Sequence, residues 1–508
     1  MTTKLVGITK DGTDFSLDID PSVQVLDLKE NNLTFIDLTP LENCRELRAL
    51  SLCQNNLEKL NLAPLEQCSK LQELILWGNE LTEINLKPLE KCPNLRTLSL
   101  AQNRLDKVNL SPLGKCQKLQ QLILNNNDLQ KIDLEPLEKC EELLVLSLAV
   151  NQLKKVSLSA FKKAKFLREL YLNENQLKKI DLAPLKYCPE LLILSLNQNQ
   201  LKKIDLFPLE NCTKLHELYL WGNQIESVNL HPFYALTEVR TLTLTQNELK
   251  HIDLTPLKNC SKLEILLFNE NILHHLDLKP LENCSNLKLL SFWGNILTEI
   301  DLSPLKECSQ LQELYLSQNY FQKIDLSPLE KCEKLQKLYL QNNPMKQIDV
   351  YPLRDKKELK EFSIDPRIEI TWNSPHSIPT NTDLPTVLQP FRDSLMKSQQ
   401  KYTGAQRQEW VQEVSKIVDK QEKEHDKKIE KFIKVIERSK VLKINQLAMI
   451  LEKEEKELLL WLYELPEEFN FKINRDEIIF EQDLNISKHL NFLEESFAQW
   501  ECKDSKKK

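Results

Sequence analysis

Residues 311–334 read LQELYLSQNYFQKIDLSPLEKCEK and are one copy of a 24-residue unit that recurs fourteen times over residues 23–358. Counted from Leu311 as position 1, apolar residues occupy positions 1, 4, 6, 11, 14, 16 and 19. Self-similarity at a fixed period of this length predicts a solenoid, in which each unit packs mainly against its two neighbours. The repeat therefore decides the fold of most of the chain.

The first half of the unit has the pattern of a short strand. Leu314, Tyr315 and Leu316 alternate inward, outward and inward, as in a strand with one buried face. So short a strand cannot close a core alone, and stacking joins the leucines of all copies into one spine. Proline follows at position 18 in thirteen copies, with Leu and Cys three residues apart after it, which predicts one helical or 3₁₀ turn on the outer side.

Position 9 is asparagine in every copy. Its amide both donates and accepts hydrogen bonds, so it suits the turn that follows the strand. A buried amide costs several kcal/mol unless it is bonded, and we expect neighbouring copies to satisfy it in a ladder. The ladder residues are Asn31, Asn55, Asn79, Asn103, Asn127, Asn151, Asn175, Asn199, Asn223, Asn247, Asn271, Asn295, Asn319 and Asn343.

The pattern LxxLxLxxNxLxxIxLxPL, read for example from Leu218-Tyr219-Leu220 through Asn223, resembles the leucine-rich repeat of the typical, 24-residue type. The resemblance covers residues 23–371 without a gap and implies an α/β horseshoe with a parallel sheet on its concave face. Members of that family mostly bind other proteins, but the fold alone names no partner.

Composition argues against several classes of protein. The 508 residues include 68 basic and 75 acidic side chains, and this mild net charge of −7 favours neither nucleic acid nor an anionic membrane surface. The first residues, MTTKLVGITKDG, lack the apolar run of a signal peptide. No stretch reaches the ~18 apolar residues of a membrane span. We therefore expect a soluble, cytoplasmic protein without membrane contact.

The cysteines follow the repeat rather than the spacing of a metal site. Eleven of the thirteen occupy position 22, and Ala164 and Leu236 fill that slot in two other copies. A slot that accepts Cys, Ala or Leu is apolar, so we predict buried free thiols rather than disulfides or metal ligands. His251 and His275 occupy equivalent positions in successive copies, but no carboxylate or thiol accompanies them at a matching slot. No metal or other cofactor is predicted.

Positions 3, 5 and 7 should point outward from the concave sheet. Positions 3 and 5 alternate between bulky and small residues in a 48-residue rhythm, and position 7 adds three tryptophans. Duplication of paired units explains the rhythm, but it explains less well why Trp and Tyr persist at accessible positions. We therefore predict a protein-binding face with aromatic anchors and a column of carboxylate acceptors. The predicted residues are Trp77, Trp221, Trp293, Tyr171, Tyr219, Tyr315, Tyr339, Glu73, Glu169, Glu217 and Glu313.

Four segments follow from the pattern. Residues 1–22 predict a capping hairpin around Asp11-Gly12, and 23–371 form the solenoid with a broken last copy as its second cap. Residues 372–404 are a proline-rich linker. Residues 405–508 begin with a charged helix and continue as helix, helix and hairpin, which is similar to a winged helix. Over residues 440–500 there are 13 acidic and 7 basic residues, a balance that favours protein docking over DNA.

Two smaller features have an ordinary explanation as well as a functional one. Lys154-Lys155, Lys178-Lys179 and Lys202-Lys203 stack in three neighbouring copies as a basic patch, which either meets an acidic partner or is a solvated edge. Cys502-Lys503-Asp504 has the CxD spacing of bacterial ubiquitin ligases that carry leucine-rich repeats, although only six residues follow the cysteine. No phosphate loop, HExxH or GxSxG is present.

These observations predict a non-enzymatic scaffold or adaptor without catalytic residues. It would hold a protein partner on the concave face, and the C-terminal module would dock a second protein. Two alternatives stay open: a nucleic-acid-binding regulator that acts through the winged helix, and a ubiquitin-ligase-like enzyme.

Overall fold

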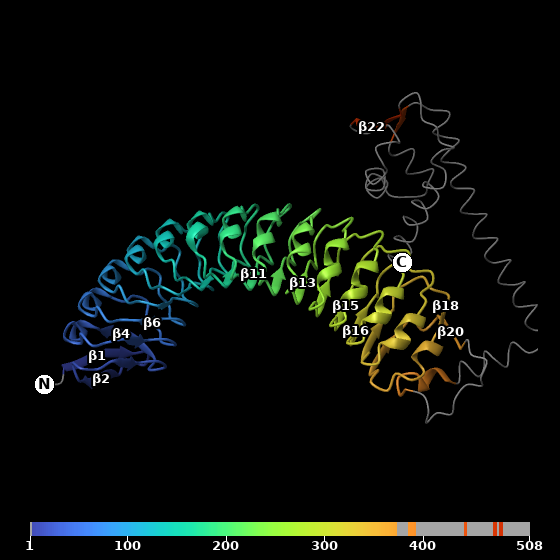
Figure 1. The fold of residues 1–508 in the computed structure, drawn as a ribbon. Coiled ribbons are helices and arrows are strands. Elements are labelled where there is room, and N and C mark those ends of the chain that lie inside the picture. Colours follow the sequence, from blue (N-terminus) through green and yellow to red (C-terminus); the bar gives the residue numbers. More distant parts are fainter. Residues whose placement is uncertain (1–2, 373–384, 393–440, 444–470, 475–476, 481–508) are drawn as a thin grey trace, which may run out of the picture. The chain divides into compact units, whose positions relative to one another are not determined.

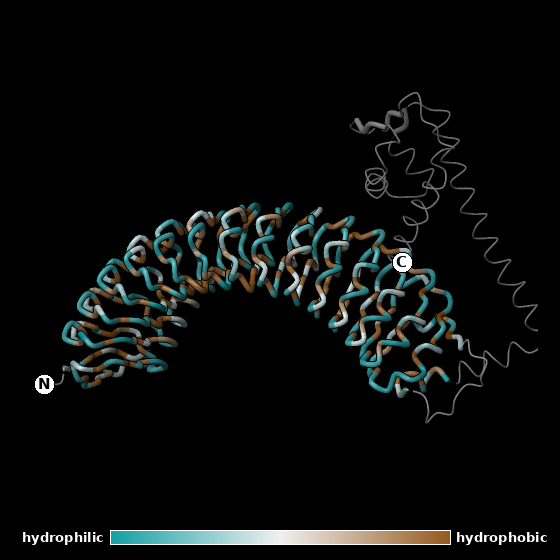
Figure 2. Tube along the Cα trace, in the orientation of Figure 1, coloured by the Kyte–Doolittle hydropathy of each residue, from teal (hydrophilic) through white to brown (hydrophobic). Residues whose placement is uncertain are grey.

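The computed structural model describes residues 3–372, 385–392, 441–443, 471–474 and 477–480. The chain divides into two compact units, Met1–Met396 and Lys397–Lys508, and the first contains all fourteen repeats. Figure 1 shows residues 3–372 as a curved array with strands such as β11, β13 and β15 along its inner, concave side. Hydrophobic residues recur along each coil of that array in Figure 2.

The concave side is a 15-stranded parallel sheet that contains one short strand from each repeat and a last one beyond them. Neighbouring strands pair in register, so that Leu194 lies opposite Leu170 and Leu218. This register places equal positions of successive repeats side by side in columns. The strands are β3 (Val25–Asp27), β5 (Ala49–Ser51), β6 (Glu73–Ile75), β7 (Thr97–Ser99), β8 (Gln121–Ile123), β9 (Val145–Ser147), β10 (Glu169–Tyr171), β11 (Ile193–Ser195), β12 (Glu217–Tyr219), β13 (Thr241–Thr243), β14 (Ile265–Leu267), β15 (Leu289–Ser291), β16 (Glu313–Tyr315), β17 (Lys337–Tyr339) and β19 (Glu361–Ser363).

Each repeat returns through a 3₁₀ helix. Asp, Asn or Ser at position 15 starts the turn, because its side-chain oxygen accepts a hydrogen bond from the backbone N–H two residues later. Asp205 Oδ1, for example, accepts from Phe207 N at 3.0 Å. Proline follows because its fixed φ suits the first helical turn, yet Ala160 replaces it in the sixth repeat without loss of the helix. The helices are η1 (Thr39–Asn43), η2 (Ala63–Gln67), η3 (Lys87–Lys91), η4 (Ser111–Lys115), η5 (Glu135–Lys139), η6 (Ser159–Lys163), η7 (Ala183–Tyr187), η8 (Phe207–Asn211), η9 (His231–Tyr234), η10 (Thr255–Asn259), η11 (Lys279–Asn283), η12 (Ser303–Glu307), η13 (Ser327–Lys331) and η14 (Tyr351–Leu353).

The core between sheet and 3₁₀ helices is made of leucine rows and a row of thiols. The twelve cysteines among the described residues are free and buried, as the sequence predicted. Most thiols of the row donate to a carbonyl of the preceding repeat, as Cys212 Sγ does to Leu185 O at 3.3 Å. Desolvation raises the pKa of the Cys212 thiol to about 12, so the row is neutral at physiological pH.

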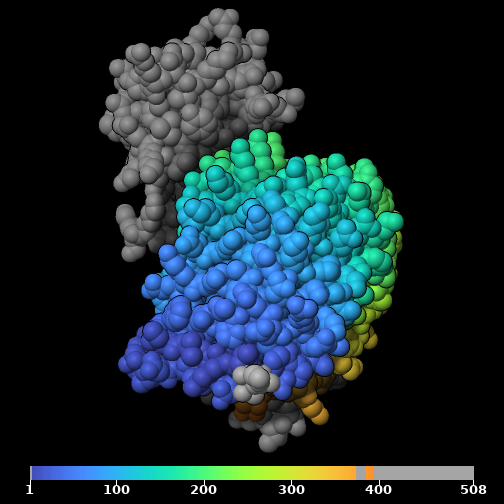
Figure 3. All heavy atoms as spheres, turned by 90° about the vertical axis from the view of Figure 1, so that its left-hand side faces the viewer, coloured from blue at the N-terminus to red at the C-terminus, as the bar shows by residue number. Residues whose placement is uncertain are grey.

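The array begins with an antiparallel hairpin of β1 (Thr3–Thr9) and β2 (Asp14–Ile19). Strand β1 also pairs with β4 (Leu33–Asp37) of the first repeat. Leu5 and Ile19 join the hydrophobic core, so the hairpin covers leucines that no earlier repeat could cover. Figure 3 shows this end of the array in blue, nearest to the viewer.

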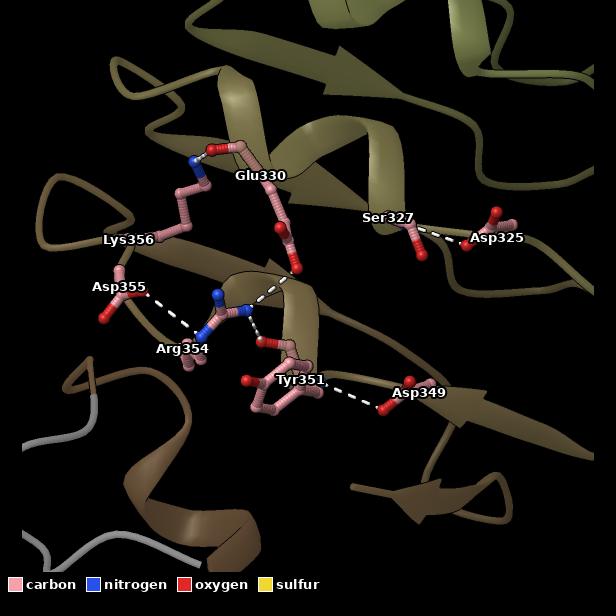
Figure 4. A network of polar contacts seen from close by, with 8 residues as sticks. All are labelled: Asp325, Ser327, Glu330, Asp349, Tyr351, Arg354, Asp355 and Lys356. Atoms are coloured by element: carbon pink, nitrogen blue, oxygen red, sulfur yellow. Dashed lines mark hydrogen bonds and ion pairs between the residues drawn. The ribbon is translucent and has the colours of Figure 1, made fainter. Parts of the chain in front are cut away.

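At the other end, β18 (Gln347–Asp349) pairs with β20 (Glu369–Thr371), and a polar network replaces the thiol row (Figure 4). Lys356 occupies the cysteine slot of the fourteenth repeat and is only 3% exposed. Its ammonium donates to the carbonyl oxygen of Glu330 at 2.9 Å, and desolvation lowers the pKa of Lys356. Arg354 donates to the Glu330 carboxylate at 2.8 Å. The short helix η15 (Gln389–Phe391) follows.

In the second unit the structure describes three strands, β21 (Val441–Lys443), β22 (Phe471–Asn474) and β23 (Glu477–Phe480). They form an antiparallel sheet in the order β21-β23-β22. The strands β22 and β23 coincide with the predicted hairpin. The charged helix, both helices of the predicted winged helix and Cys502 lie outside the described residues.

Candidate functional site

The concave sheet presents its outward columns as the alternation in the sequence predicts. In β10 and β12 the central leucines, Leu170 and Leu218, are fully buried, while the flanking Glu and Tyr are half-buried. Short side chains at position 5 are buried between bulky neighbours. Ser195, which lies between Tyr171 and Tyr219, is only 5% exposed. The face is therefore ridged, and its small residues are its buried floor.

The hydroxyl of each concave tyrosine donates a hydrogen bond to a glutamate. Tyr171 Oη donates to Glu169 Oε2 at 2.9 Å, across two residues of one strand. Tyr219 does the same with Glu217 at 2.7 Å, and Tyr315 with Glu313 at 2.5 Å. Desolvation and the neighbouring carboxylate raise the pKa of Tyr219 to about 12. Three of the four predicted acceptor carboxylates thus already hold a hydroxyl of their own repeat.

The other predicted Glu and Tyr residues of these columns do not form a glutamate–tyrosine bond within one repeat. Glu73 has no tyrosine in its own repeat because position 5 is Ile75, and it stays exposed. Position 3 of the fourteenth repeat is Lys337, which pairs with Glu313 at 3.3 Å, and Tyr339 donates instead to Glu361 of the next strand. The rings of Tyr315 and Tyr339 stack with centroids 4.9 Å apart.

The indoles of Trp77, Trp221 and Trp293 are half-buried at position 7, and glycine follows each. Position 8 has a positive φ in all fourteen repeats, for example 66° at Gly222 and 54° at Gln246. The turn therefore places this residue in the left-handed region whether or not tryptophan precedes it. A Cβ on Gly222 would lie 3.1 Å from Gln198 Cγ of the preceding repeat, so glycine also relieves a close approach there.

The asparagine row lies behind this face and is bonded to backbone. Asn199 Nδ2 donates to Leu172 O at 3.0 Å and Leu196 O at 3.1 Å, and its Oδ1 accepts from Leu177 N at 3.0 Å. The same bonds link each row asparagine from Asn55 to Asn343 with the repeat before it. Asn31 has no preceding repeat: it is half-buried and donates only to Lys29 O. The row thus staples neighbouring repeats through amide-to-backbone bonds rather than amide-to-amide bonds.

Two secondary features of the sequence lie away from the concave columns. Lys154, Lys155, Lys178 and Lys179 line an open hollow of about 730 Å³ over Val156 and Ile180. The His251 ring lies 6.1 Å from that of His274, the residue before His275. Among the residues that the structure describes, no group of three or more His, Cys, Asp or Glu side chains is arranged to hold a metal ion.

No helix in the described part of the chain has the length and hydrophobicity needed to cross a bilayer. The concave columns of residues 23–358 are the candidate site. Sequence reasoning found their aromatic residues but not the glutamate–tyrosine bonds, for which the spacing of Glu at position 3 and Tyr at position 5 was the available signal.

Comparison with known proteins places these features in context. The leucine rich repeat family matches residues 21–81, 69–129, 117–177, 165–225, 213–273 and 285–345, more than half of the chain. No curated protein matches the sequence.

Several solved structures share the fold. A leucine-rich repeat protein of Leptospira interrogans is 25% identical, with 70% of this chain and 86% of that chain covered and a TM-score of 0.61. The internalin InlF of Listeria monocytogenes is 24% identical, with 69% and 89% covered and a TM-score of 0.52. The functional domain of InlJ from Listeria monocytogenes, described as including a cysteine ladder, is 23% identical, with 72% and 78% covered and a TM-score of 0.51.

Proposed function

The chain belongs to the leucine-rich repeat family, and from this premise we propose that it is a non-enzymatic scaffold that binds a protein partner on its concave face. Proteins of this family generally mediate contacts between proteins. The proposal assigns the contact to the concave columns at positions 3, 5 and 7, with Trp77, Trp221 and Trp293 as apolar anchors.

The observation that carries the proposal is the way the tyrosines are held. Tyr171, Tyr219 and Tyr315 are half-buried, and each hydroxyl is fixed to a glutamate two residues earlier. Aromatic side chains dominate the energy of protein interfaces, and a ring that is already fixed loses little conformational entropy on binding. The glutamates orient these rings, and Glu73 is the one predicted carboxylate with no tyrosine in its own repeat.

We further propose that the second unit docks another protein. The support is its charge: the 13 acidic and 7 basic residues over 440–500 would repel a phosphate backbone. The rival function, nucleic-acid binding through a winged helix, predicts DNA binding by the full chain that weakens steeply with salt. The cytoplasmic location and the ligase-like alternative at Cys502 stay predictions from the sequence.

Affinity capture with matched variants tests the concave assignment. Proteins captured from native lysate by the full chain are compared with those captured by a Tyr219→Ala/Trp221→Ala variant and a Phe207→Ala/Tyr234→Ala variant. Phe207 and Tyr234 are 57% and 37% exposed on the 3₁₀ helices η8 and η9, so they control for loss of exposed aromatic area elsewhere.

The concave variant should lose the partner, with binding weaker by roughly 2 kcal/mol or more, and the 3₁₀ variant should keep it. Equal recovery by the wild type and the concave variant would contradict the concave assignment. Loss only with the 3₁₀ variant would move the binding face to the other side of the array.

A further inference from the structure

The flank that joins the concave strands to the 3₁₀ helices carries a run of lysines in the middle of the array. Positions 12 and 13 of each repeat lie on this flank, after the asparagine turn and before the 3₁₀ helix. Position 13 is lysine in the five consecutive repeats 4–8, position 12 is lysine in repeats 6–8, and all eight residues are exposed. These eight residues, which we call the basic flank, are Lys107, Lys131, Lys154, Lys155, Lys178, Lys179, Lys202 and Lys203.

Several lysines elsewhere on the surface of the array pair with a glutamate of a neighbouring repeat. In the same column at position 13, Lys59 of the second repeat contacts Glu83 of the third at 3.2 Å. At position 24, Lys262 contacts Glu238 of the preceding repeat at 2.6 Å. No lysine of the basic flank forms an ion pair with any residue that the structure describes. On the basic flank this compensation between repeats is missing.

The missing glutamates leave like charges on neighbouring repeats. The contact of Lys59 with Glu83 shows that position 13 side chains of successive repeats can reach each other. Lys179 has Lys155 on one side and Lys203 on the other, and like charges on neighbouring rungs repel. Residues 152–205 contain eleven basic and five acidic side chains, although the whole chain has a net charge of −7. Positive charge is therefore concentrated at repeats 6–8.

The basic flank also surrounds a hollow. Four of its lysines, from repeats 6 and 7, line an open hollow of about 730 Å³ over the half-buried side chains of Val156 and Ile180. Asp181 lines it too, but its Oδ1 already accepts a hydrogen bond from the backbone N–H of Ala183 at 2.9 Å. Ammonium groups above an aliphatic floor match the side chains of Asp and Glu. Their carboxylates form charge-assisted hydrogen bonds with lysine, and their CH₂ groups can contact the floor.

The composition of the hollow favours an acidic polypeptide over nucleic acid or a membrane. Proteins that bind single-stranded nucleic acid provide aromatic rings on which the bases stack. The described residues that line the hollow include neither an aromatic ring nor an arginine. Binding to a membrane surface buries apolar side chains of the protein among the lipids. Val156 and Ile180 instead are half-buried beneath exposed lysines.

We propose that the basic flank binds an acidic segment of a protein, whose Asp and Glu carboxylates pair with the lysines around the hollow of repeats 6 and 7. This inference goes beyond the proposed function, because the segment needs no contact with the concave columns. Rungs are spaced ~5 Å apart, so the five lysines of position 13 span ~20 Å, which about six extended residues can cover. The bound carboxylates supply the negative charge that glutamates supply in other parts of the array.

The first test measures binding of a labelled poly-glutamate peptide to the full chain by fluorescence anisotropy at low salt. A Lys155→Glu/Lys179→Glu variant should bind the peptide about tenfold more weakly, because two attractions become repulsions. A Lys70→Glu/Lys262→Glu variant is the matched control, since it changes the net charge equally at lysines that already pair with glutamates. Equal weakening in both variants, or no binding to the wild type, would overturn the proposal.

The second test measures the melting temperature of the free, full chain. Lys179→Glu places a carboxylate between Lys155 and Lys203, so the melting temperature should rise. Lys262→Glu removes the ion pair with Glu238, so the melting temperature should fall. A gain in stability together with a loss of peptide binding would also exclude unfolding as the cause of that loss. Equal falls in both variants would show that Lys179 is not repelled by its neighbours, which contradicts the proposal.

The same titration distinguishes the other polyanions and the concave face. A single-stranded oligonucleotide or a phosphatidylserine vesicle that bound more tightly than the peptide, and lost binding in the Lys155→Glu/Lys179→Glu variant, would overturn the assignment to an acidic polypeptide. The Tyr219→Ala/Trp221→Ala variant should bind the peptide as the wild type does. Weaker binding there would place the peptide on the concave face and overturn the inference. The proposed function would still be judged separately, by capture of the partner.

Discussion

The asparagine row at position 9 and the concave residues at position 7 lie two residues apart in every repeat, and Asn199 and Asn269 show how differently they treat a side-chain amide. Asn199 satisfies its amide with carbonyls and an N–H of two repeats. Asn269, at position 7, has a buried side-chain oxygen without a hydrogen-bond partner. The asparagine row joins repeats to each other, whereas the residues at position 7 belong to the concave face.

The difference shows how one repeat can use different residues to stabilise the array and to bind a partner. Interior rows are bonded completely and recur nearly without change, since a break in them leaves backbone groups of two repeats unsatisfied. The concave columns vary from repeat to repeat: position 7 holds Trp, Asn, Thr, Ser, Ala, Gln, Lys or Cys. The array tolerates that variation because its stability comes from the interior rows of leucine, cysteine and asparagine.

The largest expected effect concerns the thiol row and alkaline pH. Burial raises the pKa of thiols such as Cys188, Cys212 and Cys284 to about 12, against 9.0 for an ordinary thiol. Above about pH 9 the unfolded chain loses these protons and the folded chain keeps them, so stability falls as pH rises towards 12. Each such thiol lowers the free energy of unfolding by at most about 1.4 kcal/mol per pH unit in this window, and the contributions of the row act in the same direction.

Denaturant titrations at a series of pH values between about 8 and 11 measure this slope. A Cys188→Ala/Cys212→Ala variant is the control, because Ala164 already fills the same slot in the sixth repeat. The variant should lose stability less steeply with pH than the wild type. Identical slopes would mean that the thiols do not stay protonated in the folded array.

The next effect concerns the asparagine row. Asn199→Ala leaves Leu172 O and Leu177 N without a side-chain partner, and we expect it to lower the free energy of unfolding by ~1–3 kcal/mol. Asn31→Ala should cost less, because Asn31 is half-buried and its side chain bonds only within its own turn. Thermal melts of both variants measure the difference. Equal losses would show that the bonds between repeats add nothing to the row.

The smallest expected effect is a gain in stability at the rim of the concave face. Val150 occupies position 8 with φ 53°, a left-handed conformation that a β-branched side chain disfavours. Asn126 holds the same position with φ 57° in the fifth repeat. Val150→Asn should therefore stabilise the chain by about 1 kcal/mol, while Gln102→Asn, at φ 52° and without branching, should change it less. A loss of stability on Val150→Asn would show that packing of Val150 outweighs the strain.

Periodicity predicted the repeat, its short strand, the short outer turns and the buried thiols, because apolar spacing reports which side chains point inward. The resemblance to leucine-rich repeats implied the parallel sheet. Periodicity did not predict what the outward residues do to each other. The sequence predicts Glu217 as an acceptor for a partner but does not indicate that it also accepts the hydroxyl of Tyr219.

One further feature escaped sequence reasoning for the same reason. Lys356 fills a slot that the sequence predicts to be apolar, because the Glu330 carbonyl accepts a hydrogen bond from its ammonium. Hydrogen bonds between neighbouring repeats depend on distance and direction, and an alternation of residue types carries neither.

The central claim, that interior rows hold the array while the concave columns bind, is tested by two measurements on two variants. The free energy of unfolding and the Kd for the captured partner are determined for Asn199→Ala and Trp221→Ala in the full chain. The account predicts that Asn199→Ala lowers the free energy of unfolding and leaves Kd unchanged, and that Trp221→Ala weakens binding and leaves the free energy of unfolding nearly unchanged. If both variants shift both quantities alike, holding and binding are not separate in this molecule.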